Sequence, residues 1–210
     1  MDKLTVALPK GRLLNEALAL FTRAGYPTHY TNSRRLLLDD ETGSLRFMLV
    51  KPVDVPTYVE YGAAVLGVAG EDVLRESARD VYEPLGLGIG KCRLVLAGPP
   101  SAKGRNLRLE PNVRVATKYP RLARQYFQEQ GISAEIIPLS GSIELATTVG
   151  LADLVVDLVQ TGRTLKENNL IELATIMESQ AMLLVNRASH KLYFEAIREV
   201  INRLAQALAR

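Results

Sequence analysis

The sequence contains one cysteine, Cys92, and no run of about 18 apolar residues. A single cysteine can form neither an internal disulfide nor a zinc cluster, which indicates a reducing compartment and predicts a cytoplasmic protein. Because no long apolar run is present, we expect no membrane-spanning helix. Residues 1–12 also lack the apolar stretch of a signal peptide.

A block of basic residues is also missing. The formal net charge is only +3, and lysine and arginine are scattered over both halves of the chain. This distribution predicts that nucleic acid is not a partner. A mildly basic balance nevertheless suits an anionic small molecule. The 210 residues, 47% of them hydrophobic, suffice for one globular domain or for two small ones around a cleft.

Apolar runs of strand length alternate with helix-period patterns along the chain. Strand-like runs occupy 4–8, 45–51, 63–70, 92–98, 113–117, 134–139, 152–157, 170–179 and 181–186. Helical patterns occupy 13–25, 55–62, 119–131, 142–150 and 190–210. In the last of these, one apolar face is formed by Leu192, Ile197, Val200, Ile201, Leu204 and Leu208. The alternation predicts an α/β protein with mainly parallel central sheets.

A glycine-rich segment, residues 86–92, divides the alternating pattern and predicts a hinge. We therefore expect two lobes around a cleft, as in periplasmic-binding-protein-like architectures. Lobe I comprises residues 1–89 together with 184–210, and lobe II comprises residues 90–183.

The segment DLVVDLVQTGRTL, residues 153–165, ends a strand at Asp157 and continues into a turn of small residues. Ligands of parallel sheets bind beyond the carboxyl ends of the strands. The turn Thr161–Thr164 offers backbone amides, two hydroxyls and a helix start to a phosphate group. A carboxylate such as Asp157 accepts hydrogen bonds from sugar hydroxyls. The segment thus predicts a ribose-5-phosphate site made by Asp157, Thr161, Gly162, Arg163 and Thr164.

Residues 153–165 also have a purely structural interpretation, without a ligand. Thr164 could be the N-cap of a helix and Asp157 a surface acid at a strand end. The motif alone does not identify a reaction.

Residues 144–165, ELATTVGLADLVVDLVQTGRTL, resemble the signature of the ATP phosphoribosyltransferases, which open histidine biosynthesis. Further blocks similar to this family lie at 7–18, 32–38, 54–74, 87–99 and 115–127. The resemblance implies transfer of the phosphoribosyl group of phosphoribosyl pyrophosphate (PRPP) to adenine N1 of ATP, with release of pyrophosphate. It also implies a Mg²⁺ ion that is held mainly by substrate and water, without direct protein ligands.

The resemblance implies cations for the phosphates of both substrates, at or after strands of lobe I. These candidate catalytic residues are Lys10, Arg12, Arg34 and Lys51. Between Arg34 and the adjacent Arg35 the choice stays open. In lobe II, Glu144 and Asp153 join the candidate PRPP ligands. Two positions depart from the family pattern, Lys51 where arginine is frequent and Val65 where aspartate is frequent.

In length the chain resembles the short form of the family. This form works with a separate regulatory subunit that is similar to the catalytic part of histidyl-tRNA synthetase, in a hetero-octamer, and is expected to be a homodimer in isolation. Two other functions compete with this one: a solute-binding module without catalysis, and a basic nucleic-acid binder.

Overall fold

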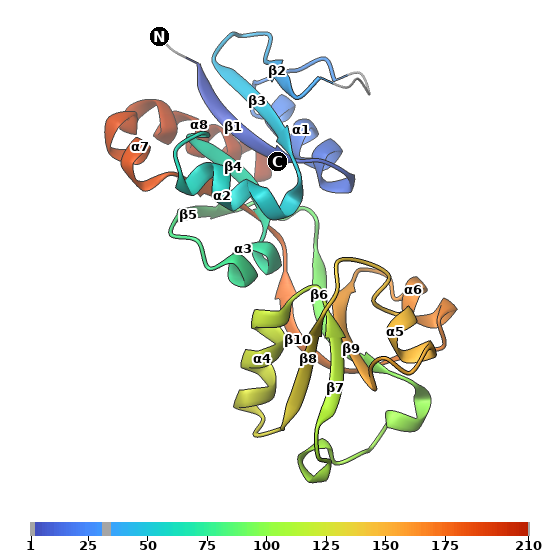
Figure 1. Ribbon diagram of the computed structural model, residues 1–210. Coiled ribbons are helices and arrows are strands. Elements are labelled where there is room, and N and C mark those ends of the chain that lie inside the picture. Colours follow the sequence, from blue (N-terminus) through green and yellow to red (C-terminus); the bar gives the residue numbers. More distant parts are fainter. Residues whose placement is uncertain (1–2, 31–34, 210) are drawn as a thin grey trace. The chain divides into compact units, whose positions relative to one another are not determined.

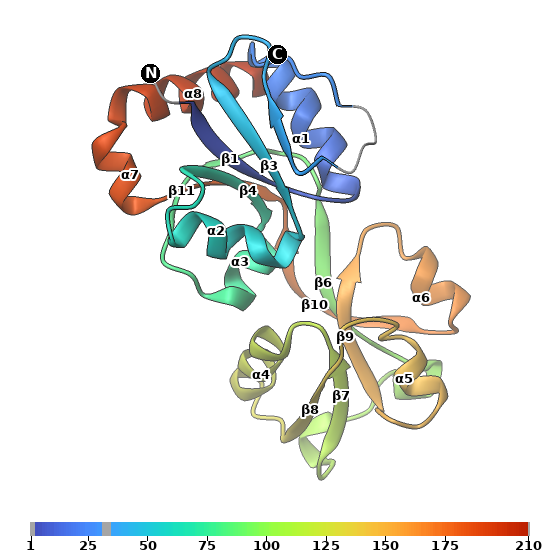
Figure 2. The same cartoon turned by 45° about the horizontal axis from the view of Figure 1, so that its top comes forward.

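The computed structural model describes residues 3–30 and 35–209. The chain forms two compact units (Figures 1 and 2): unit 1 contains Met1–Gly90 and Gln180–Arg210, and unit 2 contains Lys91–Ser179. The chain passes from unit 1 to unit 2 after Gly90, one residue from the predicted boundary after residue 89. It returns to unit 1 after Ser179, earlier than the predicted residue 183, because the strand that follows belongs to the sheet of unit 1.

Unit 1 is built on a six-stranded sheet with the order β2-β3-β1-β4-β11-β5. Strands β3, β1 and β4 are mutually parallel, whereas β2 pairs antiparallel with β3, and β11 pairs antiparallel with both β4 and β5. The strands are β1 (Leu4–Pro9), β2 (Leu37–Asp39), β3 (Leu45–Val50), β4 (Leu66–Gly70), β5 (Tyr82–Gly86) and β11 (Ala181–Val185).

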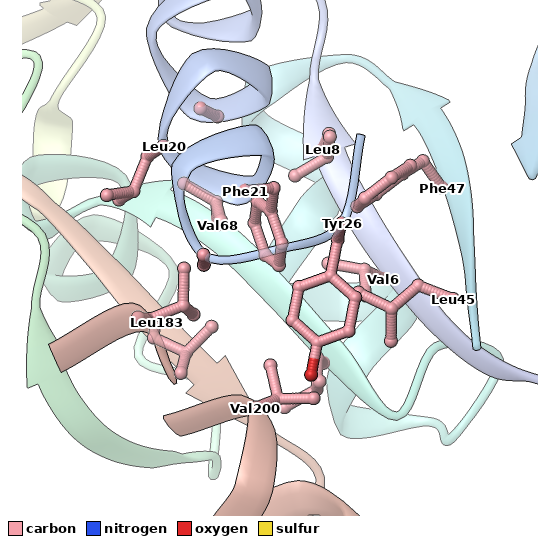
Figure 3. Close-up of a cluster of buried hydrophobic side chains, with 14 of the residues drawn as sticks. Val6, Leu8, Leu20, Phe21, Tyr26, Leu45, Phe47, Val68, Leu183 and Val200 are labelled. Atoms are coloured by element: carbon pink, nitrogen blue, oxygen red, sulfur yellow. The ribbon is translucent and has the colours of Figure 1, made fainter. Parts of the chain in front are cut away.

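Helices cover both faces of this sheet, because alternate residues of the central strands are buried on opposite sides. Val6 and Leu8 of β1 pack in one core cluster with residues of α1 and α8, and Ala7 packs in another with residues of α2 and α3. Figure 3 shows the first cluster, in which Phe21 meets Phe47 with ring centroids 5.1 Å apart. The helices of unit 1 are α1 (Arg12–Arg23), η1 (Pro52–Asp54), α2 (Val55–Glu60), α3 (Glu71–Ser77), α7 (Arg187–Leu192) and α8 (Phe194–Leu208).

Unit 2 contains a five-stranded sheet with the order β10-β6-β9-β7-β8. Strands β7, β8 and β9 are parallel, and β6 pairs antiparallel with its two neighbours. Helix α4 covers one face, while α5 and α6 contribute to the core on the other. The elements are β6 (Cys92–Gly98), η2 (Pro100–Ala102), η3 (Leu107–Leu109), β7 (Val113–Thr117), α4 (Pro120–Glu129), β8 (Ala134–Pro138), α5 (Leu145–Thr148), β9 (Leu154–Val159), α6 (Arg163–Glu167) and β10 (Ile171–Ser179).

The predicted α/β architecture is confirmed, but the sheets are mixed and not mainly parallel, with four parallel and five antiparallel strand pairings. Among the strands and α-helices, the sequence analysis missed β2, β5 and α3. Strand β5 contains Pro84 and lies at the sheet edge, where a proline is tolerated. The predicted helix over 190–210 is two helices that meet at Tyr193, so Leu192 is 76% exposed and does not belong to the buried face. In the part of the chain that the structure describes, every helix is too short or too polar to cross a bilayer.

Candidate functional site

The carboxyl ends of β7, β8 and β9 lie at one edge of the unit 2 sheet, because these three strands run in the same direction. This is the edge at which open α/β sheets bind ligands. The segments that leave it are Lys118–Tyr119, residues 139–144 and residues 160–162, which lead into α4, α5 and α6.

The segment Thr161–Thr164 turns sharply into α6. Gly162 caps the helix in the left-handed region, with φ of 77°. An added Cβ there would meet only Val159, at 4.0 Å, so the backbone angle and not lack of space favours glycine. The Arg163 N–H donates to the Thr161 hydroxyl at 3.5 Å, and both residues are exposed together with Thr164. The turn therefore offers amides and hydroxyls to an anion.

Asp157 lies on the α5/α6 face of β9, between the buried side chains of Val155 and Val159. Burial raises the pKa of Asp157 above the ordinary aspartate value, and the negative charge of Glu144 raises it further. Two groups lower the pKa of Asp157. The Leu158 N–H donates a hydrogen bond to Oδ1 at 2.8 Å, and Lys118 contributes a positive charge. A half-buried carboxylate at this edge can accept hydrogen bonds from a ligand's hydroxyl groups.

Glu144 immediately precedes α5, and its carbonyl accepts a hydrogen bond from the Thr147 hydroxyl at 3.0 Å. The negative charge of Glu144 acts on the carboxylate of Asp157, so the two acids lie in one neighbourhood. The structure thus gathers Glu144, Asp157 and the turn Thr161–Thr164 at the same edge of the unit 2 sheet.

Asp153 does not belong to this group. It precedes β9, at the opposite edge of the sheet, and its carboxylate accepts from the Arg114 backbone N–H at 2.9 Å and from the Arg114 guanidinium at 3.0 and 3.3 Å. The Arg114 guanidinium holds the pKa of Asp153 below its usual range. Because both carboxylate oxygens are engaged there, we correct the assignment of Asp153 as a PRPP ligand.

The side chain of Arg163 is also occupied. Its Nε lies 2.7 Å from the Glu167 carboxylate, one turn further along α6. The backbone of Arg163 stays part of the turn, whereas its guanidinium serves as an intrahelical ion pair.

Lys118 was missed by the sequence analysis. It directly follows Thr117, which is paired with Val156 of β9, and this register places it beside Asp157. The available signal was a lysine at the end of a strand, in front of the helix-starting Pro120. Without the strand register, nothing distinguished this lysine from other exposed ones.

In unit 1 the predicted cations also lie at a carboxyl edge. Lys10 follows Pro9 of β1, and Lys51 follows Val50 of β3, which is the residue paired with Pro9. Both lysines are exposed, and so is Arg12, the first residue of α1. Arg34 lies outside the described residues.

Val65 packs against the core cluster of unit 1. Its backbone N–H donates to the Thr5 carbonyl at 2.9 Å, and its carbonyl accepts from the Asn186 N–H at 3.0 Å. Within residues 3–30 and 35–209, no group of three or more histidine, cysteine, aspartate or glutamate side chains is placed to hold a metal ion.

Solved structures that share this architecture include the following two. The chain superimposes on the ATP phosphoribosyl transferase (HisG:HisZ) complex from Thermotoga maritima with a TM-score of 0.84 and 35% identity, covering 98% of each chain. The alkanesulfonate-binding protein SsuA from Xanthomonas axonopodis pv. citri gives a TM-score of 0.59 at 15% identity, over 99% of this chain and 73% of that one. The second similarity concerns the fold alone, and it agrees with the predicted binding-protein-like architecture.

Sequence similarity extends over the whole chain. The ATP phosphoribosyltransferase of Caldanaerobacter subterraneus subsp. tengcongensis is 49% identical over 210 residues, which cover 99% of both proteins. The family model for ATP phosphoribosyltransferase matches residues 51–206. The chain therefore belongs to the ATP phosphoribosyltransferase family.

Proposed function

We propose that the turn Thr161–Thr164 binds the 5-phosphate of PRPP and that Asp157 accepts hydrogen bonds from its ribose hydroxyls, with Glu144 beside it. The activity itself follows from the family: the chain transfers the phosphoribosyl group of PRPP to N1 of the adenine of ATP in the first step of histidine biosynthesis. The observation that supports the site is a half-buried acid next to an exposed, glycine-capped turn on one sheet edge.

The chemistry requires little from a general base. Adenine N1 has a free lone pair, so it attacks C1′ of the ribose without losing a proton. The C1′–O bond to pyrophosphate breaks, positive charge grows on the sugar, and the electron pair leaves with pyrophosphate. Positioning two anionic substrates and stabilising these charges supply most of the rate enhancement.

Positive side chains must therefore meet the phosphates. We assign this role to the cations Lys10, Arg12, Arg34 and Lys51 of unit 1. Lysine at position 51 supplies a charge but not the planar, two-pronged donor set of arginine, so we expect it to act as a point charge.

A Mg²⁺ ion would take most of its oxygen ligands from the pyrophosphate group and from water. Asp157 and Glu144 are carboxylates at the unit 2 edge, and we assign neither of them as a direct ligand of the ion. When bound, the ion would neutralise the charge that develops on the leaving pyrophosphate.

The solved relative from Thermotoga maritima is a HisG:HisZ complex. We propose that this chain likewise works with a regulatory subunit similar to histidyl-tRNA synthetase, in a hetero-octamer in the cytoplasm, and forms a homodimer without it. Histidine should then inhibit the complex but barely affect this chain alone, which initial-rate assays with and without the partner would measure. Strong inhibition of the isolated chain would contradict the proposal.

The site is tested by titrating PRPP calorimetrically into wild type, Thr161→Ala and Asp157→Ala, together with a turnover assay. Loss of a charge-assisted hydrogen bond of about 1.5–3 kcal/mol predicts about 10- to 150-fold weaker PRPP binding. The affinity for ATP should change little. If both variants bind PRPP normally, the site is wrong. If wild type binds PRPP but shows no turnover even with the regulatory subunit present, the chain is a binding module.

A further inference from the structure

We propose that Lys118 is a positioning residue whose ammonium group is the counter-charge that keeps Asp157 a carboxylate turned toward the bound pentose. The inference rests on the proposed function of Asp157, and it adds a residue from a different strand to the site.

The register of the sheet places the two side chains together. Thr117, the last residue of β7, is paired with Val156 of β9. Ala116 belongs to the same core cluster as Val155 and Val159, the residues that flank Asp157 on its own face. Lys118 is the first residue after β7, just as Asp157 is the residue after Val156, so the register brings Lys118 to the level of Asp157, and its positive charge acts on that carboxylate.

The backbone around Lys118 is held on both sides. The buried Thr117 hydroxyl accepts from the Tyr119 N–H at 2.8 Å, which fixes a tight turn across Lys118. Tyr119 then packs against the core cluster under α4, and α4 begins at Pro120. The backbone of Lys118 therefore has a defined position, and the residue is exposed.

The surroundings of Asp157 make this charge important. Its neighbours on the face are apolar: Val155 and Val159 on its own strand, Ile143 before α5, and Leu165 on α6. The charges that act on the carboxylate are those of Lys118, which favours ionisation, and Glu144, which opposes it. The other charged groups of the adjacent α6 are Arg163, Lys166 and Glu167, of which the first and last pair with each other.

Ionisation of Asp157 matters for binding a sugar phosphate. A carboxylate accepts hydrogen bonds at both oxygens, whereas a protonated acid also presents a donor and loses acceptor capacity. Arrival of the phosphate adds negative charge near the acid, which favours protonation further. A lysine beside Asp157 opposes both effects and preserves PRPP affinity at lower pH.

The test is the pH profile of kcat/KM for PRPP in wild type, Lys118→Met, Lys118→Arg and Glu144→Gln. Lys118→Met should move the acid limb to higher pH by about half a unit or more, as expected for a lost charge interaction at a partly buried site. Lys118→Arg should restore the wild-type limb, and Glu144→Gln should move it to lower pH. Lys103→Met serves as the control, because Lys103 is an exposed lysine in the loop before β7, at the opposite edge of the sheet.

Asp157→Asn separates the two proposals. If this variant keeps wild-type kinetics, the proposed PRPP site fails. If it loses PRPP binding while Lys118→Met leaves the acid limb at the wild-type pH, only the role of Lys118 is overturned. A uniform fall in kcat/KM at every pH in Lys118→Met, with no shift of the limb, would equally overturn it, because that result describes a direct substrate contact. Melting temperatures at each pH verify that the variants are folded.

Discussion

Asp153 and Asp157 are four residues apart, but they serve opposite edges of the unit 2 sheet. Asp153 is fixed by Arg114 through three hydrogen bonds, whereas among the described residues Asp157 accepts a hydrogen bond from the N–H of its own neighbour, Leu158, alone. A strand rises about 3.3 Å per residue, so the two acids are roughly 13 Å apart along β9. Asp153, with both carboxylate oxygens hydrogen-bonded, stabilises the fold. Asp157 keeps acceptor capacity that a ligand can use.

Replacing Asp153 should therefore affect stability and spare catalysis. Asp153→Asn should lower the free energy of unfolding by about 1 kcal/mol, because the ion pair with Arg114 is partly exposed. The pKa of Asp153 is lowered on folding, so its contribution is present above its unfolded value of 3.8 and is lost as the pH falls below that value. Urea denaturation at neutral pH and near pH 3 measures the difference. An increased KM for PRPP in this variant would return Asp153 to the site.

Replacing Asp157 should do the reverse. Its pKa is raised on folding, so its stabilising contribution is present below the unfolded value of 3.8 and is lost as the pH rises through the folded value. At neutral pH the buried charge therefore costs stability, and Asp157→Asn should melt at the same or a higher temperature than wild type while it binds PRPP at least tenfold more weakly. Thermal scans at pH 7 and pH 3.5, beside calorimetry, check both parts. A variant that is destabilised at pH 7 would contradict this account.

The turn glycine can be tested against a matched glycine. Gly162 has φ of 77° and Gly131, in the turn after α4, has φ of 65°, and neither has close neighbours for a Cβ. Gly162→Ala and Gly131→Ala should each cost about 1 kcal/mol of stability through the left-handed backbone. Only Gly162→Ala should raise the KM for PRPP, because only that turn carries the proposed phosphate contacts. Equal kinetic effects in the two variants would remove the turn from the site.

The adjacent lysines of unit 1 should act together. Lys10 and Lys51 follow Pro9 and Val50, which are paired in the sheet, so the two charges face the same phosphates in our proposal. Lys10→Met and Lys51→Met should each lower kcat/KM, and the double variant should depart from the sum of the single effects by at least 0.5 kcal/mol. Lys3→Met is the control, since Lys3 precedes the other end of β1 and pairs with Asp39 at 2.8 Å. Strict additivity would place the two lysines on separate groups.

The local parts of the site could be predicted because they are contiguous in the chain. Asp157 and the turn Thr161–Thr164 belong to one strand–turn–helix segment, so their spacing alone specifies an acid near an amide-rich turn. Strand β5 could not be predicted, because its sequence YEPLG contains Pro84 and has no strand-like apolar pattern. It forms a strand because β11 supplies its hydrogen bonds.

What the sequence determined by itself is the alternation of strands and helices, the family, and the glycine-containing turn at Thr161–Thr164 that we propose binds phosphate, because periodicity and short motifs act over a few residues. Only the tertiary structure decided that Lys118 follows the strand paired beside Asp157, that Asp153 turns to Arg114, and that β11 extends the sheet of unit 1. Each of these depends on which strand pairs with which and in what register. Such pairings are selected by the burial of both sheet faces over the whole unit, and no single segment encodes them.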